Sequence, residues 1–299
     1  MGLKTNTLQT KRFSTLLLVG VISITLALSG VFTSIASAAS LAWQPQTPAQ
    51  LEQWRSITWS PELNLFVAVA SSGTNRVMTS PDGITWTPRT APAGFLAWED
   101  VTWSPELNLF VAVAAAVGTD RVMTSPDGIA WTQRTAPEGV WRSVVWSAEL
   151  GLFVAVASFG ANSVMTSPDG ITWTARAVPQ DNQWYDVAWS PTQGFVATAV
   201  TGANRVMTSP DGITWTPRTP PEANNWISVT WSASLGRYVA VAAVLGTGGT
   251  SRVMTSSDGI TWTLGSIADV AWQDVTWSPQ QGRFVAVGLG GTTETLPHR

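Results

Sequence analysis

Six segments that each begin with a tryptophan contain the residues whose side chains could take part in catalysis or binding. With each tryptophan counted as the first position, the third position alternates between serine and aspartate, which places carboxylates at Asp100, Asp186 and Asp274. Three carboxylates that converge could bind a cation, and such oxygen ligands suit Ca²⁺ or Mg²⁺. Each aspartate could instead accept hydrogen bonds from a neighbouring strand. The sequence indicates no other cofactor and leaves both interpretations open.

The second position of these segments is irregular, whereas the residues around it repeat. A glycoside hydrolase of the paired-carboxylate kind could use Glu99, Asp100 and Asp186, although nothing in the sequence sets the separation between them. The six second-position residues are Arg55, Glu99, Arg142, Tyr185, Ile227 and Gln273.

Other catalytic chemistries are excluded by composition. The chain has no cysteine, so a disulfide, a thiolate metal site or a cysteine nucleophile cannot form. Its single histidine, His298, lies in the tail. A Ser-His-Asp triad, a histidine metal site and most general-base schemes are therefore unavailable.

Residues 1–38 are predicted to be a secretory signal peptide. Lys4, Lys11 and Arg12 precede an apolar run over 13–32, and small residues follow at 36–39. Cleavage after Ala38 would give a secreted or periplasmic protein, while an uncleaved run is long enough to anchor the chain in a bilayer. Removing the three positive charges takes the formal net charge from −3 to −6. An acidic domain disfavours nucleic acid and anionic membranes as partners.

A unit of about 43 residues repeats through the rest of the chain and predicts the scaffold that positions these side chains. In the first unit, strands A to D are expected at 54–59, 65–70, 76–79 and 84–89. Asp82-Gly83 predicts a tight hairpin between strands C and D. Residues 39–299 are thus predicted to be all-β, a six-bladed β-propeller with four strands in each blade. The blades begin near Trp54, Trp98, Trp141, Trp184, Trp226 and Trp272.

The tryptophan count supports six blades and locates the closure of the ring. Three tryptophan positions in each blade account for all 18 tryptophans only if Trp43 supplies strand D of the last blade. The segment 41–48 matches 213–220 in pattern, so residues 39–48 are predicted to close the last blade. Closure removes two exposed sheet edges. The segment 294–298 contains Pro297 and is expected to fray.

The hairpin from Ser80 to Trp86 resembles the Asp box, the repeat of bacterial neuraminidases and related propellers, in a shortened form. The resemblance implies a structural turn at the aspartates Asp82, Asp127, Asp169, Asp211 and Asp258. Among the enzymes with this repeat, sialidases use a tyrosine nucleophile paired with glutamate, an aspartate and an arginine cluster. The resemblance offers three candidates for these roles: Tyr185 as the nucleophile, Glu99 as the glutamate paired with it, and Asp186 as the aspartate. Arg55 and Arg142 are the candidate carboxylate binders.

The expected function follows from which face of the scaffold varies. The B–C loops and D–A connections differ among blades and share one face, and binding residues usually lie on such loops. Strand A is expected to be innermost. Its leading tryptophans could stack on sugar rings or pack in the interior, and packing is favoured.

The sequence predicts a non-catalytic propeller that binds a glycan or protein partner. The ligand-binding candidates are the six leading tryptophans together with Arg55, Glu99, Arg142, Tyr185 and Gln273. A sialidase-like glycoside hydrolase and a structural or assembly propeller are the alternatives.

Overall fold

The computed structural model describes residues 46–94, 96–116, 118–160, 162–289 and 293–296. These residues belong to a compact unit that begins at Pro45. The elements found in them are β-strands, and they include no helix long and apolar enough to cross a membrane. The strands form six antiparallel sheets, which we number in chain order.

Five sheets have four strands and the sixth has three, each strand pairing with the one before it. Sheet 1 contains β1 (Trp54–Ser60), β2 (Leu65–Ala70), β3 (Arg76–Ser80) and β4 (Thr87–Thr90). Sheet 2 contains β5 (Ala97–Ser104), β6 (Leu109–Ala115), β7 (Val122–Ser125) and β8 (Thr132–Arg134). Sheet 3 contains β9 (Trp141–Ser147), β10 (Leu152–Ala157), β11 (Val164–Ser167) and β12 (Thr174–Arg176). Sheet 4 contains β13 (Trp184–Ser190), β14 (Gly194–Ala199), β15 (Val206–Ser209) and β16 (Thr216–Arg218). Sheet 5 contains β17 (Asn225–Ser232), β18 (Arg237–Val244), β19 (Val253–Ser256) and β20 (Thr263–Leu264). Sheet 6 contains β21 (Trp272–Ser278), β22 (Arg283–Gly288) and β23 (Thr293–Leu296).

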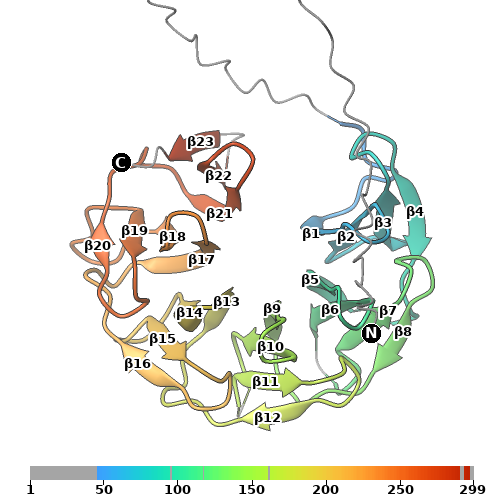
Figure 1. Ribbon diagram of the computed structural model, residues 1–299, viewed down its shortest axis with the longest axis horizontal. Helices are drawn as coiled ribbons and strands as arrows, with labels where there is room; N and C mark the ends of the chain where they lie inside the picture. Colours follow the sequence, from blue (N-terminus) through green and yellow to red (C-terminus); the bar gives the residue numbers. More distant parts are fainter. Residues whose placement is uncertain (1–45, 95, 117, 161, 290–292, 297–299) are drawn as a thin grey trace, which may run out of the picture. The chain divides into compact units, whose positions relative to one another are not determined.

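The sheets stand around a common centre with the first strand of each nearest to it (Figure 1). We call β1, β5, β9, β13, β17 and β21 the inner strands. Neighbouring sheets pack face to face, so the second strands are apolar on both sides. In β10, for example, Phe153 to Ala157 are all fully buried. This two-sided burial explains the repeated Phe-Val-Ala-Val-Ala pattern.

Tryptophans join one sheet to the next in two ways. The leading tryptophans of sheets 2 to 6 are fully buried and lie in the apolar clusters that separate the sheets. In sheets 2 to 4 the second tryptophan of the inner strand instead donates its indole N–H to a glutamate of the preceding sheet. Trp103 Nε1 donates to Glu62 at 2.7 Å and Trp146 Nε1 donates to Glu106 at 2.6 Å. Aromatic burial and these charge-assisted bonds together fix how neighbouring sheets pack.

The Asp-Gly turns between the third and fourth strands shorten the outermost strands relative to the prediction. Strand D of the first unit begins at Thr87 rather than at Ile84. Asp82 Oδ1 accepts the N–H groups of Ile84 and Thr85, at 2.8 and 2.7 Å, so these groups are taken by the turn. Gly83 has a φ of 71°, in the left-handed region where a side chain would be strained.

The predicted closing strand of sheet 6 falls mostly outside the described residues. Residues 39–45 of the predicted closing strand lie outside the described residues, and 46–48 form no strand. The predicted fraying is wrong for β23, because Thr293–Leu296 pairs with β22 along its whole length. The described strands form no closed sheet, and Figure 1 shows sheet 6 separated from sheet 1.

Candidate binding site at the inner strands

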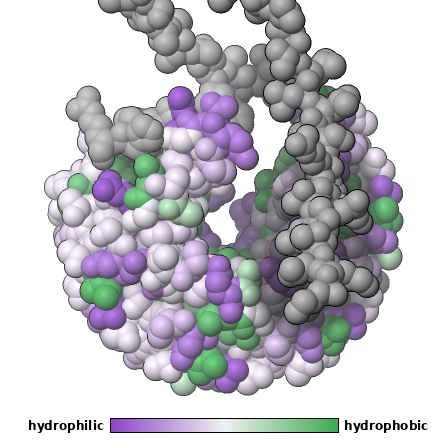
Figure 2. All heavy atoms as spheres, viewed as in Figure 1, coloured by the Kyte–Doolittle hydropathy of each residue, from purple (hydrophilic) through white to green (hydrophobic). Residues whose placement is uncertain are grey.

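An open cavity of about 870 Å³ lies among the inner strands. Its wall includes all six second-position residues and all six third-position residues of these strands. Figure 2 shows the hollow from one side, with hydrophilic surface on part of its wall. The structure therefore brings together the positions that the sequence singled out, although they are spread over more than two hundred residues.

A β-bulge in every inner strand explains why the second position faces the cavity. The pairing skips this residue in each sheet, for example between Trp98 and Asp100 in β5 and between Trp184 and Asp186 in β13. A bulged residue makes no regular ladder pair and is re-aimed by the local kink. We call Arg55, Glu99, Arg142, Tyr185, Ile227 and Gln273 the bulge residues. The bulge was not predicted, because it has no turn residue that marks it.

Three bulge residues form an ion cluster. Glu99 Oε2 lies 3.3 Å from Arg142 Nη1 and 3.7 Å from Arg55 Nε. The side chain of Glu99 is only 12% exposed, whereas those of Arg142 and Arg55 are 23% and 48% exposed. The carboxylate is thus held inside the wall with the two guanidinium groups on either side, and the terminal nitrogens of Arg55 are open to a ligand.

Two serines that sequence reasoning missed hold these arginines in place. Arg55 Nε donates to Ser71 Oγ at 3.1 Å and Arg142 Nε donates to Ser158 Oγ at 2.9 Å. Both serines stand 16 residues after their arginine, at the end of the second strand. The other four sheets have no serine at this position. This covariation between copies of the repeat is the signal that could have identified them.

Arg142 also packs against Tyr185. Its guanidinium carbon lies 5.0 Å from the centroid of the tyrosine ring, a cation–π contact. Among the hydrogen bonds of the described residues, none joins the Tyr185 hydroxyl to Glu99 or Asp186. The tyrosine is therefore placed to present a flat face beside a cation, and the base that a tyrosine nucleophile needs does not contact it.

The aspartates of the third position link neighbouring sheets. Asp100 Oδ1 accepts from Ser56 Oγ at 2.6 Å, and its Oδ2 accepts from Val144 N at 2.8 Å. Asp186 repeats this arrangement with Ser143 and with Val229 N. Asp274 Oδ1 accepts from Ser228 Oγ at 2.7 Å. Four oxygens of Asp100 and Asp186 are thus engaged by the protein itself, as the hydrogen-bonding interpretation predicted.

The electrostatics of these three aspartates make it unfavourable for all of them to carry a full negative charge. Removal from water raises the pKa of Asp100 to about 6 and that of Asp186 to about 7. For Asp186 the charge of Asp274 adds to the effect, although the Val229 N–H bond opposes it. Burial also raises the pKa of Asp274. Within the described residues no group of three or more acidic or histidine side chains is arranged to hold a metal ion.

The leading tryptophans do not line the cavity, with one exception. Trp98, Trp141, Trp184, Trp226 and Trp272 are 0% exposed, so they offer no stacking face in this structure. Trp54 in sheet 1 is partly exposed and contributes to the cavity wall. The surface open to a ligand is consequently made by the bulge residues rather than by the indoles.

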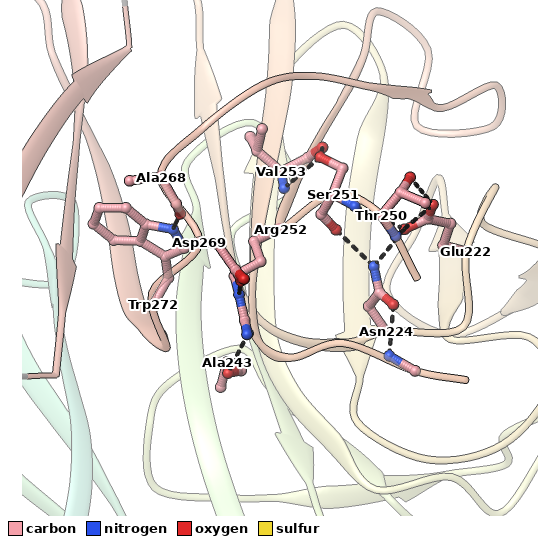
Figure 3. A network of polar contacts seen from close by, with 11 residues as sticks. Glu222, Asn224, Ala243, Thr250, Ser251, Arg252, Val253, Ala268, Asp269 and Trp272 are labelled. Atoms are coloured by element: carbon pink, nitrogen blue, oxygen red, sulfur yellow. Dashed lines mark hydrogen bonds and ion pairs between the residues drawn. The ribbon is translucent and has the colours of Figure 1, made fainter. Parts of the chain in front are cut away.

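The variable loops at the rim are held by carboxylates of the D–A connections. In Figure 3, Glu222 accepts hydrogen bonds from Thr250 and Ser251, and Asn224 donates to the Ser251 carbonyl. Arg252 forms an ion pair with Asp269 and donates to the Ala243 carbonyl. In sheet 1, Glu52 accepts from three successive backbone N–H groups at 74–76. The long loop at 243–250 is therefore anchored.

Comparisons with known proteins show the fold. No protein-family model and no curated protein matches the sequence. The chain is similar to virginiamycin B lyase from Staphylococcus aureus, with a TM-score of 0.67 and 12% identity over 84% of this chain and 86% of the other. It is similar to YCF48 bound to D1 peptide, with a TM-score of 0.59 and 17% identity over 81% and 76%. The β-propeller domain of Cps50 from Myceliophteria thermophila gives 0.54 and 14% over 80% and 81%. At these identities the likeness concerns architecture, and the six sheets have the architecture of a β-propeller.

Proposed function

We propose that this protein is a non-catalytic propeller that binds a peptide segment of a partner protein in the cavity among the inner strands. The observation that carries the proposal is the variation at the bulge. Five residue types occupy the six copies of one structural position around the cavity, while the residues on either side repeat. Sequence variation at one set of cavity-lining positions, on a scaffold that otherwise repeats, is characteristic of a surface that recognises a partner.

The chemistry of the wall suits a peptide. Arg55 offers donors for a carbonyl or carboxylate, and the Tyr185 ring beside Arg142 offers a surface for a planar or apolar side chain. Ile227 adds an apolar group and Gln273 a group that both donates and accepts. YCF48, which shares the architecture, has been seen with D1 peptide, which supports a peptide over a glycan.

Hydrolysis is the weaker alternative. The three candidate catalytic groups are engaged elsewhere, because Asp186 accepts hydrogen bonds at both oxygens and Glu99 lies between two arginines. Tyr185 contacts Arg142 rather than a carboxylate. This arrangement favours binding without bond cleavage.

The proposal includes a complete ring and export of the protein. Residues 39–48 would supply the fourth strand of sheet 6 beside β23, because they match the pattern of the outermost strands. Residues 1–38 would direct secretion. A chain that begins at residue 49 is expected to unfold at lower urea concentration than one that begins at residue 39. Equal stability of the two chains would contradict the strand assignment.

A peptide-display library is the direct test of binding. Peptides selected on the wild-type protein are expected to bind Tyr185→Ala and Arg55→Ala at least ~10-fold more weakly, as for central interface residues. Arg218→Ala, which changes the outermost strand β16, is the matched control and should bind normally. A glycan array and a panel of fluorogenic glycosides are screened in parallel. Failure of every peptide selection, or glycan binding lost in the same variants, would overturn the peptide assignment.

A further inference from the structure

Exposed aliphatic side chains gather in the turns at one end of the sheets. In sheet 1, Ser60 pairs with Leu65 and Phe66 pairs with Ser80, so the turn between the first two strands lies at the same end as the Asp-Gly turn. Among the described residues, nine of the fifteen exposed large apolar side chains lie in these two kinds of turn. We call the surface that they form the turn surface. Its aliphatic members are Leu63, Ile84, Leu107, Ile129, Leu150, Ile171, Ile213, Leu235 and Ile260.

Turns of neighbouring sheets meet on this surface. The Asp-Gly turn of sheet 3 rests on the start of β6 in sheet 2, where a Cβ added to Gly170 would come within 2.9 Å of Leu109. The exposed Ile171 follows this glycine directly, and the exposed Leu107 lies two residues before Leu109. Equivalent contacts recur between sheets 1 and 2 and between sheets 3 and 4. The aliphatic side chains of one sheet are therefore neighbours of those of the next rather than isolated exposed residues.

The same turns carry only negative charge. Backbone N–H bonds from Thr85 and Ile84 lower the pKa of Asp82 to about 2, so this carboxylate is ionised at neutral pH. The only arginines that directly border the turns between the first two strands are Arg237 and Arg283, which begin β18 and β22. The turns contain no lysine or arginine, and their acidic residues are Glu62, Asp82, Glu106, Asp127, Glu149, Asp169, Asp211 and Asp258.

We propose that the turn surface docks a partner protein through a segment that presents lysine or arginine beside aliphatic side chains. Such a segment matches both properties of the surface, because its cations complement the carboxylates and its aliphatic groups pack on the exposed isoleucines and leucines. A second copy of this chain would bring two acidic surfaces together, and an anionic membrane would be repelled in the same way. None of the turn residues lines the cavity, so the inference stands whether or not the cavity binds a peptide.

A peptide-display library selected on a variant with an impaired cavity tests the proposal. The bait carries Arg55→Ala and Tyr185→Ala, so peptides that depend on these cavity residues are not enriched. The selected peptides are expected to combine lysine or arginine with aliphatic residues and to bind more weakly as the salt concentration rises. Selection of no peptide, or only of peptides without basic residues, would overturn the proposal while leaving the cavity function untouched.

The aliphatic contribution is measured with paired substitutions in the same bait, using synthetic copies of the selected peptides and fluorescence anisotropy. Ile171→Ser with Ile213→Ser is expected to weaken binding at least ~10-fold. Phe159→Ser with Val244→Ser, which changes two exposed apolar residues outside the turns, is the matched control and should bind normally. Normal binding by the isoleucine pair would reduce the interaction to charge attraction and so contradict docking on this surface.

The charge contribution is measured without disturbing the turns. Asp169→Asn with Asp211→Asn removes two charges, while each asparagine can keep the hydrogen bonds of its turn through its own Oδ1. Binding at low salt is expected to weaken about fivefold. Asp120→Asn with Asp181→Asn removes the same charge at exposed positions outside the turns and should have little effect. An equal loss in both pairs would indicate a general attraction to an acidic protein and refute a specific site.

Discussion

Ser143 of β9 donates a 2.7 Å hydrogen bond to Asp186 of β13, and the same carboxylate accepts the Val229 N–H of β17. One side chain therefore ties three consecutive sheets together at their inner edges. The alternation of serine and aspartate, which first suggested a cation site, is accounted for by this contact. Because each donor is buried or nearly so, the carboxylate is needed to satisfy groups that water cannot easily reach.

Removal of the Asp186 carboxylate is expected to be costly. Asp186→Ala leaves the Ser143 hydroxyl and the Val229 N–H without a partner, which should lower the free energy of unfolding by about 2–4 kcal/mol. Asp186→Asn keeps one acceptor and should cost less. Urea unfolding followed by tryptophan fluorescence measures both. Asp181→Ala, at an exposed position, is the control, and a loss from Asp186→Ala no larger than this control would contradict the linking role.

The inner carboxylates also predict how stability depends on pH. The pKa of Asp186 rises from 3.8 to about 7 and that of Asp100 to about 6, so the folded state favours their protonated forms. Their contribution to the free energy of unfolding is therefore fully present below the pKa of an aspartate in the unfolded chain. It is lost as the pH rises through the pKa values of the folded state. The free energy of unfolding should fall between about pH 4 and pH 7, by no more than about 1.4 kcal/mol per pH unit for each carboxyl.

Urea unfolding across this range provides the measurement, and Asp186→Asn should flatten the slope. The aspartates of the Asp-Gly turns, such as Asp82, affect stability in the opposite direction at lower pH. Backbone N–H bonds from Thr85 and Ile84 lower the pKa of Asp82 to about 2, so its contribution is present above the unfolded value of 3.8 and is lost as the pH falls toward 2. Stability that rises steadily from pH 4 to pH 8 would contradict the raised pKa values of the inner carboxylates.

Tyr238 compensates for a shortened turn in the preceding sheet. Its hydroxyl donates to the Gly194 carbonyl at 2.6 Å, where the turn between β13 and β14 lacks one residue present in the first three sheets. Tyr238→Phe restores the residue found at this position in other sheets but removes the hydroxyl that donates to that carbonyl. We expect it to destabilise the protein by about 1 kcal/mol, measured by urea unfolding. Phe153→Leu in sheet 3, which removes no hydrogen bond, separates this polar effect from a packing effect. A neutral Tyr238→Phe substitution would show that the hydroxyl bond contributes nothing.

Much of the architecture could be predicted because it repeats. A strand pattern seen once is weak, but six copies of the same alternation and turn residues reinforce each other. The Asp-Gly turns were located for the same reason, although their aspartates accept the N–H groups of Ile84 and its equivalents, so the outer strands begin later than predicted. The site was harder to predict. The bulges at Arg55 and its equivalents have no composition signal, and the burial of Trp98 depends on how the preceding sheet packs against it. Ser71 and Ser158 were identifiable only by comparing one copy with another.

The Asp-Gly turns provide a last test, which is whether their aspartates act as hydrogen-bond acceptors or through their charge. Asp211 Oδ1 accepts from Ser209 Oγ and from the N–H groups of Ile213 and Thr214, all between 2.8 and 3.0 Å. An asparagine can keep all three bonds through its own Oδ1, whereas alanine keeps none. Asp211→Ala is therefore expected to destabilise the protein by about 1–2 kcal/mol, while Asp211→Asn should cost less than about 0.5 kcal/mol. Urea unfolding of both variants decides the matter, because a ligand-binding or charge role would make the asparagine variant as impaired as the alanine variant.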